Sequence, residues 1–582
     1  MKLTREQSRA VLHDGNALIT ACPGSGKTRT LIAKLICCLD QVRDTSRRIC
    51  CITYTNGAVY EIESRLRLYG ATGDEDYCEV STIHAFCLNN ILRYHYWRVP
   101  PYKDGFKVVP PDDDRFKEIA RNVCAEYGIA ESFQESFEQI NRDPDGTPIV
   151  PSGLTGDMAL NFWGRLLKEK LIDFPNIIYY SYTLLQQYPS IAQTLACKFA
   201  WFLIDEFQDT TSLQVEILKC IAENQKTKFF LVGDPYQSIY GFAGAHPDLM
   251  PSFANHIKAA DDFKLLDNFR SSKLIVNHAE KLFPREPPMC SVGEFKDFPE
   301  EPQYVHSPSV FEAITSYFIP ALKKFKIDYG SSAILAPQWI PLYGLGRQLR
   351  EYGIPIVGPG ARPYRRIHVF ALLAEQIAAY LDHPSALSFY RIERELFNLL
   401  NNITNTVPLN VYTHKGKVVI YRLLNSAQKI KEGTDKGIYW LESCAKNFTD
   451  ILIQAEFLTN INANSLKESV SGMKADMLKN RVDISKLNVA ALGVFASHEK
   501  NMKLLTMHRA KGTEFDAVAL IDVHEGKLPH YYAKTDEQIE ESKRLFYVAV
   551  TRAKRVLMYI TDSGNARNTP SRFLQEVGVV DT

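Results

Sequence analysis

A glycine-rich loop near the N-terminus has the residue types that bind phosphate. Residues 21–28 are Ala-Cys-Pro-Gly-Ser-Gly-Lys-Thr, and they lie between an apolar run at 16–20 and a stretch with helical spacing at 29–36. The glycines let backbone N–H groups close around phosphate oxygens, and the N-terminus of the following helix favours negative charge. We expect Lys27 to reach the β- and γ-phosphates of a nucleotide and Thr28 to ligate Mg²⁺. A glycine-rich turn that only resembles this loop is the alternative. The expected contact residues are Ala21, Cys22, Pro23, Gly24, Ser25, Gly26, Lys27, Thr28 and Arg29.

An acidic pair supplies the second part of such a site. The apolar residues 201–204 predict a buried strand that ends at Asp205 and Glu206. We expect Asp205 to lie in the Mg²⁺ shell and Glu206 to activate the attacking water as general base. A carboxylate pair that only caps the next helix is the alternative, but it does not explain the further run to Asp209.

Polar and cationic side chains would complete a phosphoryl-transfer site. A third apolar run, 228–232, is followed by Gly-Asp-Pro-Tyr-Gln, which places Gln237 at a strand end. There Gln237 could contact both the γ-phosphate and a loop that faces DNA. Arg270 and Arg552 are candidates for the cation that stabilises the transferring group, although each alone is more often a surface arginine. The predicted catalytic set is Lys27, Asp205, Glu206, Gln237, Arg270 and Arg552.

The elements that position these residues are predicted strands at 16–20, 201–204 and 228–232 and a predicted helix at 29–36. The 582 residues are enough for roughly three or four domains of about 150 residues each. Because 68 Lys and Arg residues balance 67 Asp and Glu residues, any nucleic-acid contact must be local, in a groove. The twelve cysteines lack C-x-x-C spacing, so we expect reduced thiols. No apolar run is long enough to span a membrane, and we expect a cytoplasmic protein.

In chain order, eight motifs resemble those of the superfamily 1A DNA helicases of the UvrD/Rep/PcrA family. The Q motif is Leu-Thr-Arg-Glu-Gln at 3–7, and the acidic motif is Asp-Glu-Phe-Gln-Asp at 205–209. The other matching segments are motif Ia at 52–61, Ib at 81–86, III at 233–241, IV at 268–271, V at 506–515 and VI at 544–553. So many segments in the family's order leave little room for coincidence.

This resemblance implies an α/β fold with two RecA-like motor domains, each a parallel sheet with helices on both faces. ATP would be hydrolysed in the cleft between them. Gln7 would recognise adenine, Phe269 would stack on it, Glu514 would hold the ribose, and Arg270 and Arg552 would contact the γ-phosphate. Closing and opening of the cleft would move the protein 3′ to 5′ along single-stranded DNA and separate a duplex. The DNA-binding residues implied in the same way are Tyr54, Thr55, Asn56, Thr82, His84, Tyr240, Phe242, Thr506 and His508.

The sequence departs from the family on the DNA side. Residues 241–243 are Gly-Phe-Ala where the family usually has Gly-Trp-Arg, and Gly57 stands where a lysine is common. Phe242 can still stack on a base, with less area than tryptophan, and Ala243 removes a charge. Both changes weaken the expected grip on DNA and leave the nucleotide side intact.

The motif positions divide the chain into two motor domains, each with an insertion. The predicted ranges are 1–88 with 199–270 for the first motor domain and 89–198 for its helical insertion. The second motor domain takes 271–378 with 497–582, and a shortened insertion takes 379–496. Within that insertion, the alternation at 410–421 around Lys415-Gly416 predicts a β-hairpin in a mainly helical segment.

Two functions fit this pattern. The first is a DNA-dependent ATPase and 3′–5′ helicase, for example in DNA repair. The second is a DNA- or nucleotide-sensing subunit that regulates a partner nuclease, similar to the small UvrD-like subunits of antiphage systems such as Gabija. A binding protein without hydrolysis is disfavoured, because the ATP-side residues are all present.

Overall fold

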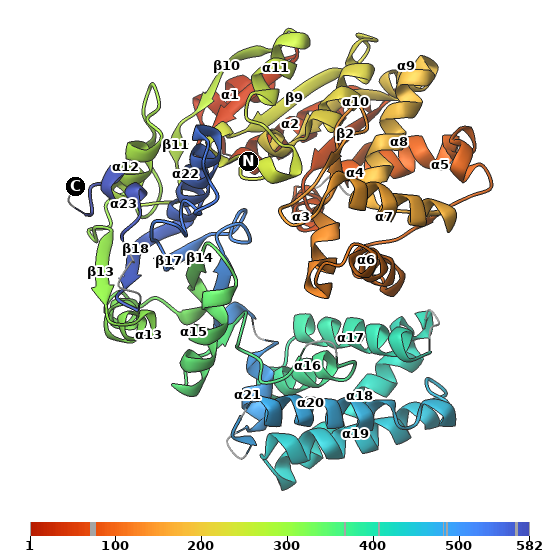
Figure 1. Ribbon diagram of the computed structural model, residues 1–582, viewed down its shortest axis with the longest axis vertical. Coiled ribbons are helices and arrows are strands. Elements are labelled where there is room, and N and C mark those ends of the chain that lie inside the picture. The colour runs from red at the N-terminus through yellow and green to blue at the C-terminus, as the bar shows by residue number, and fades with distance from the viewer. Residues whose placement is uncertain are drawn as a thin grey trace. The chain divides into compact units, whose positions relative to one another are not determined.

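The computed structural model describes residues 2–69, 77–365, 368–404, 408–480, 482–484, 487–496, 498–564 and 569–580 (Figure 1). They form two compact units. The first is Met1–Pro299 with Ala533–Thr551, and the second is Glu300–Tyr532 with Arg552–Thr582. Each unit contains a six-stranded parallel sheet.

The sheet of the first unit has the strand order β10-β1-β9-β8-β2-β3, and every pair in it is parallel. Successive residues of a strand alternate between two cores, because the sheet is covered on both faces. Leu18 lies in one core, whereas Ala17 and Ile19 lie in the other. The strands are β1 (Ala17–Ala21), β2 (Arg48–Thr53), β3 (Cys78–Thr82), β8 (Phe199–Ile204), β9 (Lys228–Gly233) and β10 (Ala260–Leu265).

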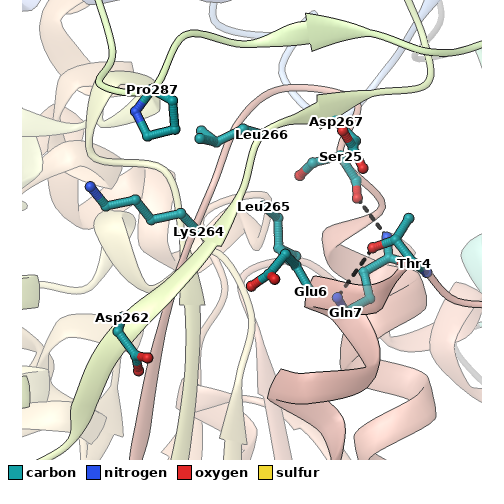
Figure 2. A pocket seen from close by; sticks show the side chains of 10 residues that line it. All are labelled: Thr4, Glu6, Gln7, Ser25, Asp262, Lys264, Leu265, Leu266, Asp267 and Pro287. Atoms are coloured by element: carbon teal, nitrogen blue, oxygen red, sulfur yellow. Dashed lines mark hydrogen bonds between the residues drawn. The ribbon is translucent and has the colours of Figure 1, made fainter.

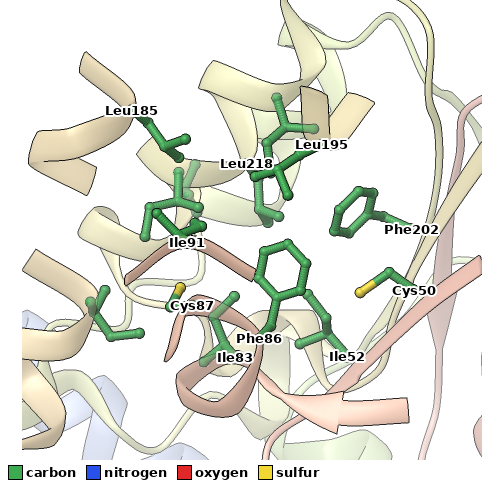
Figure 3. Close-up of a cluster of buried hydrophobic side chains, with 14 of the residues drawn as sticks. Cys50, Ile52, Ile83, Phe86, Cys87, Ile91, Leu185, Leu195, Phe202 and Leu218 are labelled. Carbon is green, nitrogen blue, oxygen red and sulfur yellow. The ribbon is translucent and has the colours of Figure 1, made fainter. Parts of the chain in front are cut away.

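Helices cover both faces of this sheet. On one face, Cys50 and Phe202 of the strands meet side chains such as Phe86 and Leu218 from the covering helices (Figure 3). The helices of that face are α4 (Ile83–Cys87), α8 (Phe174–Gln187), α9 (Pro189–Lys198), α10 (Ser212–Ala222) and α11 (Leu249–His256). The other face carries α1 (Arg5–Leu12), α2 (Lys27–Val42) and α3 (Asn56–Leu68). The first unit also contains α12 (Lys273–Leu282), α22 (Asp536–Val550) and the short pair β11 (Asp267–Asn268) and β12 (Cys290–Ser291).

The segment between β3 and β8 has a small core of its own. Phe116 and Phe162 pack edge to face in it, with ring centroids 5.0 Å apart. Between α4 and α8 its helices are α5 (Arg93–His95), α6 (Asp114–Glu126) and α7 (Gly156–Lys168). Strand β4 (Lys107–Val108) pairs with β7 (Leu171–Ile172), and β5 (Asn141–Arg142) pairs with β6 (Pro148–Ile149).

The sheet of the second unit has the order β13-β18-β17-β14-β16-β15, again with all pairs parallel. The predicted α/β fold class with parallel sheets is therefore confirmed. The strands are β13 (Gln303–Ser307), β14 (Ser332–Ala336), β15 (Ile356–Val357), β16 (Met502–Thr506), β17 (Phe515–Leu520) and β18 (Ala553–Asp562). The accompanying helices are α13 (Val310–Ala313), α14 (Ile319–Lys324), α15 (Ile340–Glu351) and α23 (Arg572–Glu576).

Domain boundaries are not fixed by these sheets alone. The compact first unit extends to Pro299 and includes α22, which lies far away in the sequence. Residue 497, the predicted start of a motor segment, lies outside the described residues. The predicted domain ranges therefore stay predictions. Within the described part of the chain, none of the helices has both the length and the apolar character needed to cross a membrane.

Between β15 and β16 the described chain is helical around one apolar core that includes Trp440 and Phe448. The helices are α16 (Ala371–Asp382), α17 (Ala386–Thr404), α18 (His414–Gly433), α19 (Gly437–Gln454), α20 (Ser465–Lys479) and α21 (Val489–Val494).

The predicted hairpin at 410–421 is wrong. A 3-10 turn (Leu409–Tyr412) leads directly into α18. The buried residues Gly416, Val419 and Ile420 continue with Leu423 and Leu424, which is the spacing of a helix face. Gly416 is needed for close approach rather than for a turn, because a Cβ there would lie 1.8 Å from the Val411 carbonyl oxygen.

We expect Gly416→Ala to destabilise this helical segment by about 1–3 kcal/mol, the usual cost of overpacking. Gly433→Ala in the same helix is the matched control, because a Cβ there meets nothing within 4 Å. Thermal unfolding and the rate of limited proteolysis within 386–480 measure the effect. Equal behaviour of the two variants would contradict the close-approach explanation.

Candidate active site

The phosphate loop joins β1 to α2 in a conformation that requires glycine. Gly24 and Gly26 have φ values of 69° and 80°, in the left-handed region. Gly26 precedes the first residue of α2, and the helix start has no side-chain cap. A Cβ on Gly24 would lie 2.6 Å from Cβ of Arg270. The loop therefore offers the glycine-dependent helix N-terminus that suits a phosphate group.

Lys27 is held at the carboxyl edge of the sheet by acidic side chains. Its Nζ lies 3.1 Å from Oε2 of Glu206. Burial alone would lower the pKa of Lys27, but Glu206, Asp234 and Asp205 outweigh it and raise the pKa. Lys27 is therefore a permanent cation.

The surroundings of Asp205 destabilise its charged form, and a bound metal ion would stabilise it. Burial, followed by the neighbouring Glu206, raises the pKa of Asp205 to about 7, and Lys27 offsets this only in part. Three carboxylates (Asp205, Glu206, Asp234) thus share this edge with few cations. The Asp205 carboxylate and the hydroxyl of the half-buried Thr28, in the first turn of α2, are oxygen donors of the kind that Mg²⁺ prefers. The assignment of Thr28 and Asp205 as ligands stays a prediction.

Glu206 is oriented by its backbone and by the side chains of Lys27 and Gln208. Its φ and ψ of 49° and 44° are left-handed, a conformation that costs a non-glycine residue about 1–3 kcal/mol. Gln208 Nε2 donates to Glu206 Oε2 at 2.6 Å, and Gln208 Oε1 accepts from the Asp234 N–H at 2.9 Å. The acidic motif is therefore tied to the end of β9.

Gln237 is buried next to the same aspartate. Its Nε2 donates to Asp234 Oδ2 at 2.6 Å. Asp234 Oδ1 accepts from Arg285 Nη2 at 2.8 Å, and this ion pair is almost fully buried. The structure thus anchors the predicted catalytic glutamine through Asp234.

Gln7 lines a pocket of about 290 Å³ with Thr4, Ser25 and Pro287 (Figure 2). It belongs to a capping box in which its Oε1 accepts from the Thr4 N–H at 3.0 Å. Its Nε2 donates to the Ser25 carbonyl at 2.9 Å. The amide keeps one N–H and one lone pair, which match the donor and acceptor of an adenine edge. Phe269, the predicted stacking residue, is exposed, and its N–H donates to the Gly24 carbonyl at 2.9 Å.

The structure distributes the remaining nucleotide candidates over both units. Arg270 Nη1 donates to the Thr551 carbonyl at 3.1 Å within the first unit. Arg552 is the first residue of the last segment of the second unit, and its side chain is buried. Its Nη1 donates to the Thr513 carbonyl at 3.1 Å. Glu514 forms a 2.9 Å ion pair with Lys554. Their contacts with a nucleotide stay predictions.

Aromatic side chains gather where β2 and β9 end. Tyr54 stacks on Tyr240 with ring centroids 5.0 Å apart, and Tyr240 lies edge to face with Phe242 at 6.0 Å. Tyr54 and Phe242 are 42% and 45% exposed, so a base can reach them. We call these three residues the aromatic surface.

The other DNA candidates also follow strands. Thr55 and Thr82 are the N-caps of α3 and α4, where their hydroxyls accept backbone N–H groups, and Asn56 begins α3. His84 contacts Phe174 at a centroid distance of 5.6 Å, and burial lowers its pKa to about 4. In the second unit, Thr506 ends β16, and burial and Lys511 lower the pKa of His508 to about 4. DNA contacts at all of these residues stay predictions.

Sequence reasoning missed three residues that organise this edge. Asp234 and Gln208 lie inside quoted motifs, so their positions could have suggested a role. Arg285 belongs to none of the motifs, and its partners lie 51 and 262 residues away. No local pattern would have found it.

Comparisons with known proteins show which family this chain resembles. The UvrD/REP helicase N-terminal domain family matches residues 3–149 and 151–258, and the UvrD-like helicase C-terminal domain family matches residues 420–564. The ATP-dependent DNA helicase Rep of Buchnera aphidicola is 25% identical over 99% of this chain and 98% of its own length. The ATP-dependent DNA helicase PcrA of Staphylococcus epidermidis and that of Staphylococcus aureus are each 25% identical, over 99% of this chain and 86% of theirs. With both terminal domains matched and full-length similarity to Rep and PcrA, the chain belongs to the UvrD-like helicase family.

Proposed function

We propose that the protein is an ATP-driven motor that moves 3′ to 5′ along single-stranded DNA and separates duplex strands. One observation carries the proposal. The loop after β9 holds Gln237 beside the buried charges and, three residues later, places Tyr240 in the aromatic surface. The names of the relatives, ATP-dependent DNA helicases, support the same activity.

In this proposal, Lys27 and Glu206 of the first unit take part in phosphoryl transfer. Bound ATP with Mg²⁺ would supply the phosphoryl group and the charge that neutralises it. Glu206, oriented by Gln208, accepts the proton of the attacking water, and Lys27 stabilises the phosphate oxygens. Arg270 and Arg552 complete the charge stabilisation in this proposal, on the strength of the family resemblance.

A second candidate function is a DNA- or nucleotide-sensing ATPase that regulates a partner nuclease, as in antiphage defence. The residue that favours it is Ala243, which provides no charge beside Phe242 where the family usually has arginine. Such a protein would hydrolyse ATP on single strands without displacing a strand by itself.

Single-stranded DNA should stimulate ATP hydrolysis, and Lys27→Ala should lower the stimulated rate by at least about 10²–10³-fold, because a buried cation on the phosphates is lost. Lys226→Ala is the control, since this exposed lysine precedes β9 at the opposite end of the strand. Phosphate release measures the rate. An ATP hydrolysis rate that does not change with DNA would contradict the motor proposal. Displacement of a labelled strand from a 3′-tailed duplex distinguishes the helicase from the sensing ATPase.

Gln7→Ala should raise the KM for ATP about tenfold or more and change the KM for GTP much less, because a matched hydrogen-bond pair to adenine is lost. Thr4→Val removes the capping hydroxyl and leaves the Gln7 side-chain amide in place. It should therefore reduce stability without changing the ratio of the KM for ATP to the KM for GTP. Steady-state kinetics with both nucleotides provide the measurement. A parallel change for ATP and GTP would contradict adenine recognition by Gln7.

Phe242→Ala should weaken single-stranded DNA binding about tenfold, and Phe242→Trp should strengthen it, since stacking contributes about 1–3 kcal/mol per base. Fluorescence anisotropy with a labelled oligonucleotide measures the affinity. Tyr60→Ala provides the control, because this exposed tyrosine lies on α3 outside the aromatic surface. If both Phe242 variants bind like the unaltered protein, the aromatic surface is not the DNA contact.

A further inference from the structure

One face of α22 contacts the loop that follows β9. Glu541 Oε1 accepts from the Gly241 N–H at 2.8 Å, and Arg544 Nε donates to the Ser238 carbonyl at 2.8 Å. Tyr547 is the third contact, through Arg285. Glu541, Arg544 and Tyr547 are three residues apart, so they lie along one side of the helix. All of these residues belong to the first unit.

Arg285 joins this helix to the end of β9. Its Nη2 donates both to Asp234 Oδ1 and to the Tyr547 hydroxyl, each at 2.8 Å. Its guanidinium carbon lies 4.7 Å from the centroid of the Tyr236 ring. The Arg285 and Asp234 side chains are only 5% and 0% exposed. A buried charge pair of this kind has little freedom to move, because breaking one contact leaves a charge or donor without a partner.

Asp234 links this pair to the predicted catalytic glutamine. While its Oδ1 accepts from Arg285, its Oδ2 accepts from Gln237 Nε2 at 2.6 Å. The position of Gln237 therefore depends on a carboxylate that Arg285 fixes.

The other end of the loop is fixed by the same helix. Gly241, whose N–H donates to Glu541, lies between Tyr240 and Phe242 of the aromatic surface. A Cβ at Gly241 would lie 2.8 Å from Glu541 Oε1, so the approach is close. Helix α22 thus contacts the loop beside the aromatic surface and, through Arg285, beside Gln237.

We propose that Arg285 is a positioning residue that couples occupancy of the aromatic surface to the placement of Gln237, with Tyr547 as its anchor on α22. This inference rests on the proposed DNA-dependent ATPase. A base that stacks on Tyr240 or Phe242 shifts the loop against Glu541, and α22 transmits the shift through Tyr547 and Arg285 to Asp234. Lysine does not replace Arg285, because its ammonium lacks the guanidinium plane that lies over the Tyr236 ring while Nη2 donates to both acceptors.

Tyr547→Phe tests the coupling with a minimal change, since it removes the hydroxyl and keeps the ring. The ratio of kcat with saturating single-stranded DNA to kcat without DNA should fall about tenfold, the usual effect of one hydrogen bond to a charged group. The KM for ATP and the affinity for the oligonucleotide should stay within about twofold, because the direct contacts remain. Arg285→Lys should give the same loss, and the double variant should be no worse than either single one.

Tyr364→Phe is the matched control. Tyr364 is also a buried tyrosine in an arginine–carboxylate cluster, with its hydroxyl donating to Glu375 at 3.1 Å and Arg362 Nε donating to the same carboxylate at 2.8 Å. It lies in the second unit, so its loss should leave the DNA stimulation unchanged. Melting temperatures of all variants identify any variant that unfolds. If Tyr547→Phe unfolds, the DNA stimulation of Arg285→Lys tests the coupling instead.

The outcomes separate the two proposals. If the unaltered protein shows no DNA stimulation, the proposed function is overturned and this inference with it. If the unaltered protein is stimulated and both Tyr547→Phe and Arg285→Lys are stimulated equally well, only the coupling role is overturned. A change confined to the KM for ATP, or losses that add in the double variant, would also contradict it.

Discussion

The first unit depends on the mutual compensation of charges buried at the carboxyl edge of its sheet. Asp205, Glu206 and Asp234 lie there with Lys27 and Arg285. Burial of any one of these charges alone would cost several kcal/mol, so each stays only because the others are in place. Burial and the neighbouring Glu206 raise the pKa of Asp205, and Lys27 lowers it only in part, so a divalent metal would stabilise its charged form.

This compensation also explains why the loop after β9 has a fixed shape. Asp234 accepts from Arg285 on one oxygen and from Gln237 on the other, and Gln208 connects its backbone to Glu206. The left-handed backbone of Glu206 is tolerated because the surrounding contacts hold it. The acidic motif and the loop after β9 are therefore one hydrogen-bonded network rather than two separate motifs.

The sequence predicted what depends on local conformation and missed what depends on distant partners. The phosphate loop could be predicted because Gly24 and Gly26 supply left-handed backbone at fixed spacing. The parallel sheets were predicted from the family resemblance of the motifs. The hairpin prediction at 410–421 failed because the alternation there does not outweigh a helix face that continues to Leu424. Arg285 was invisible because its partner Tyr547 lies 262 residues away.

The departures from the family fall where they leave this network intact. Phe242 and Ala243 lie beyond the Gly241 N–H that donates to Glu541, whereas Asp234 and Gln237 lie before it. A change of ring size or charge beyond Gly241 alters the area that a base can contact without removing any hydrogen bond among the buried charges. In the proposed motor, the strength of the DNA contact and the geometry of the nucleotide side are therefore separable, and α22 is the element through which we propose that one influences the other.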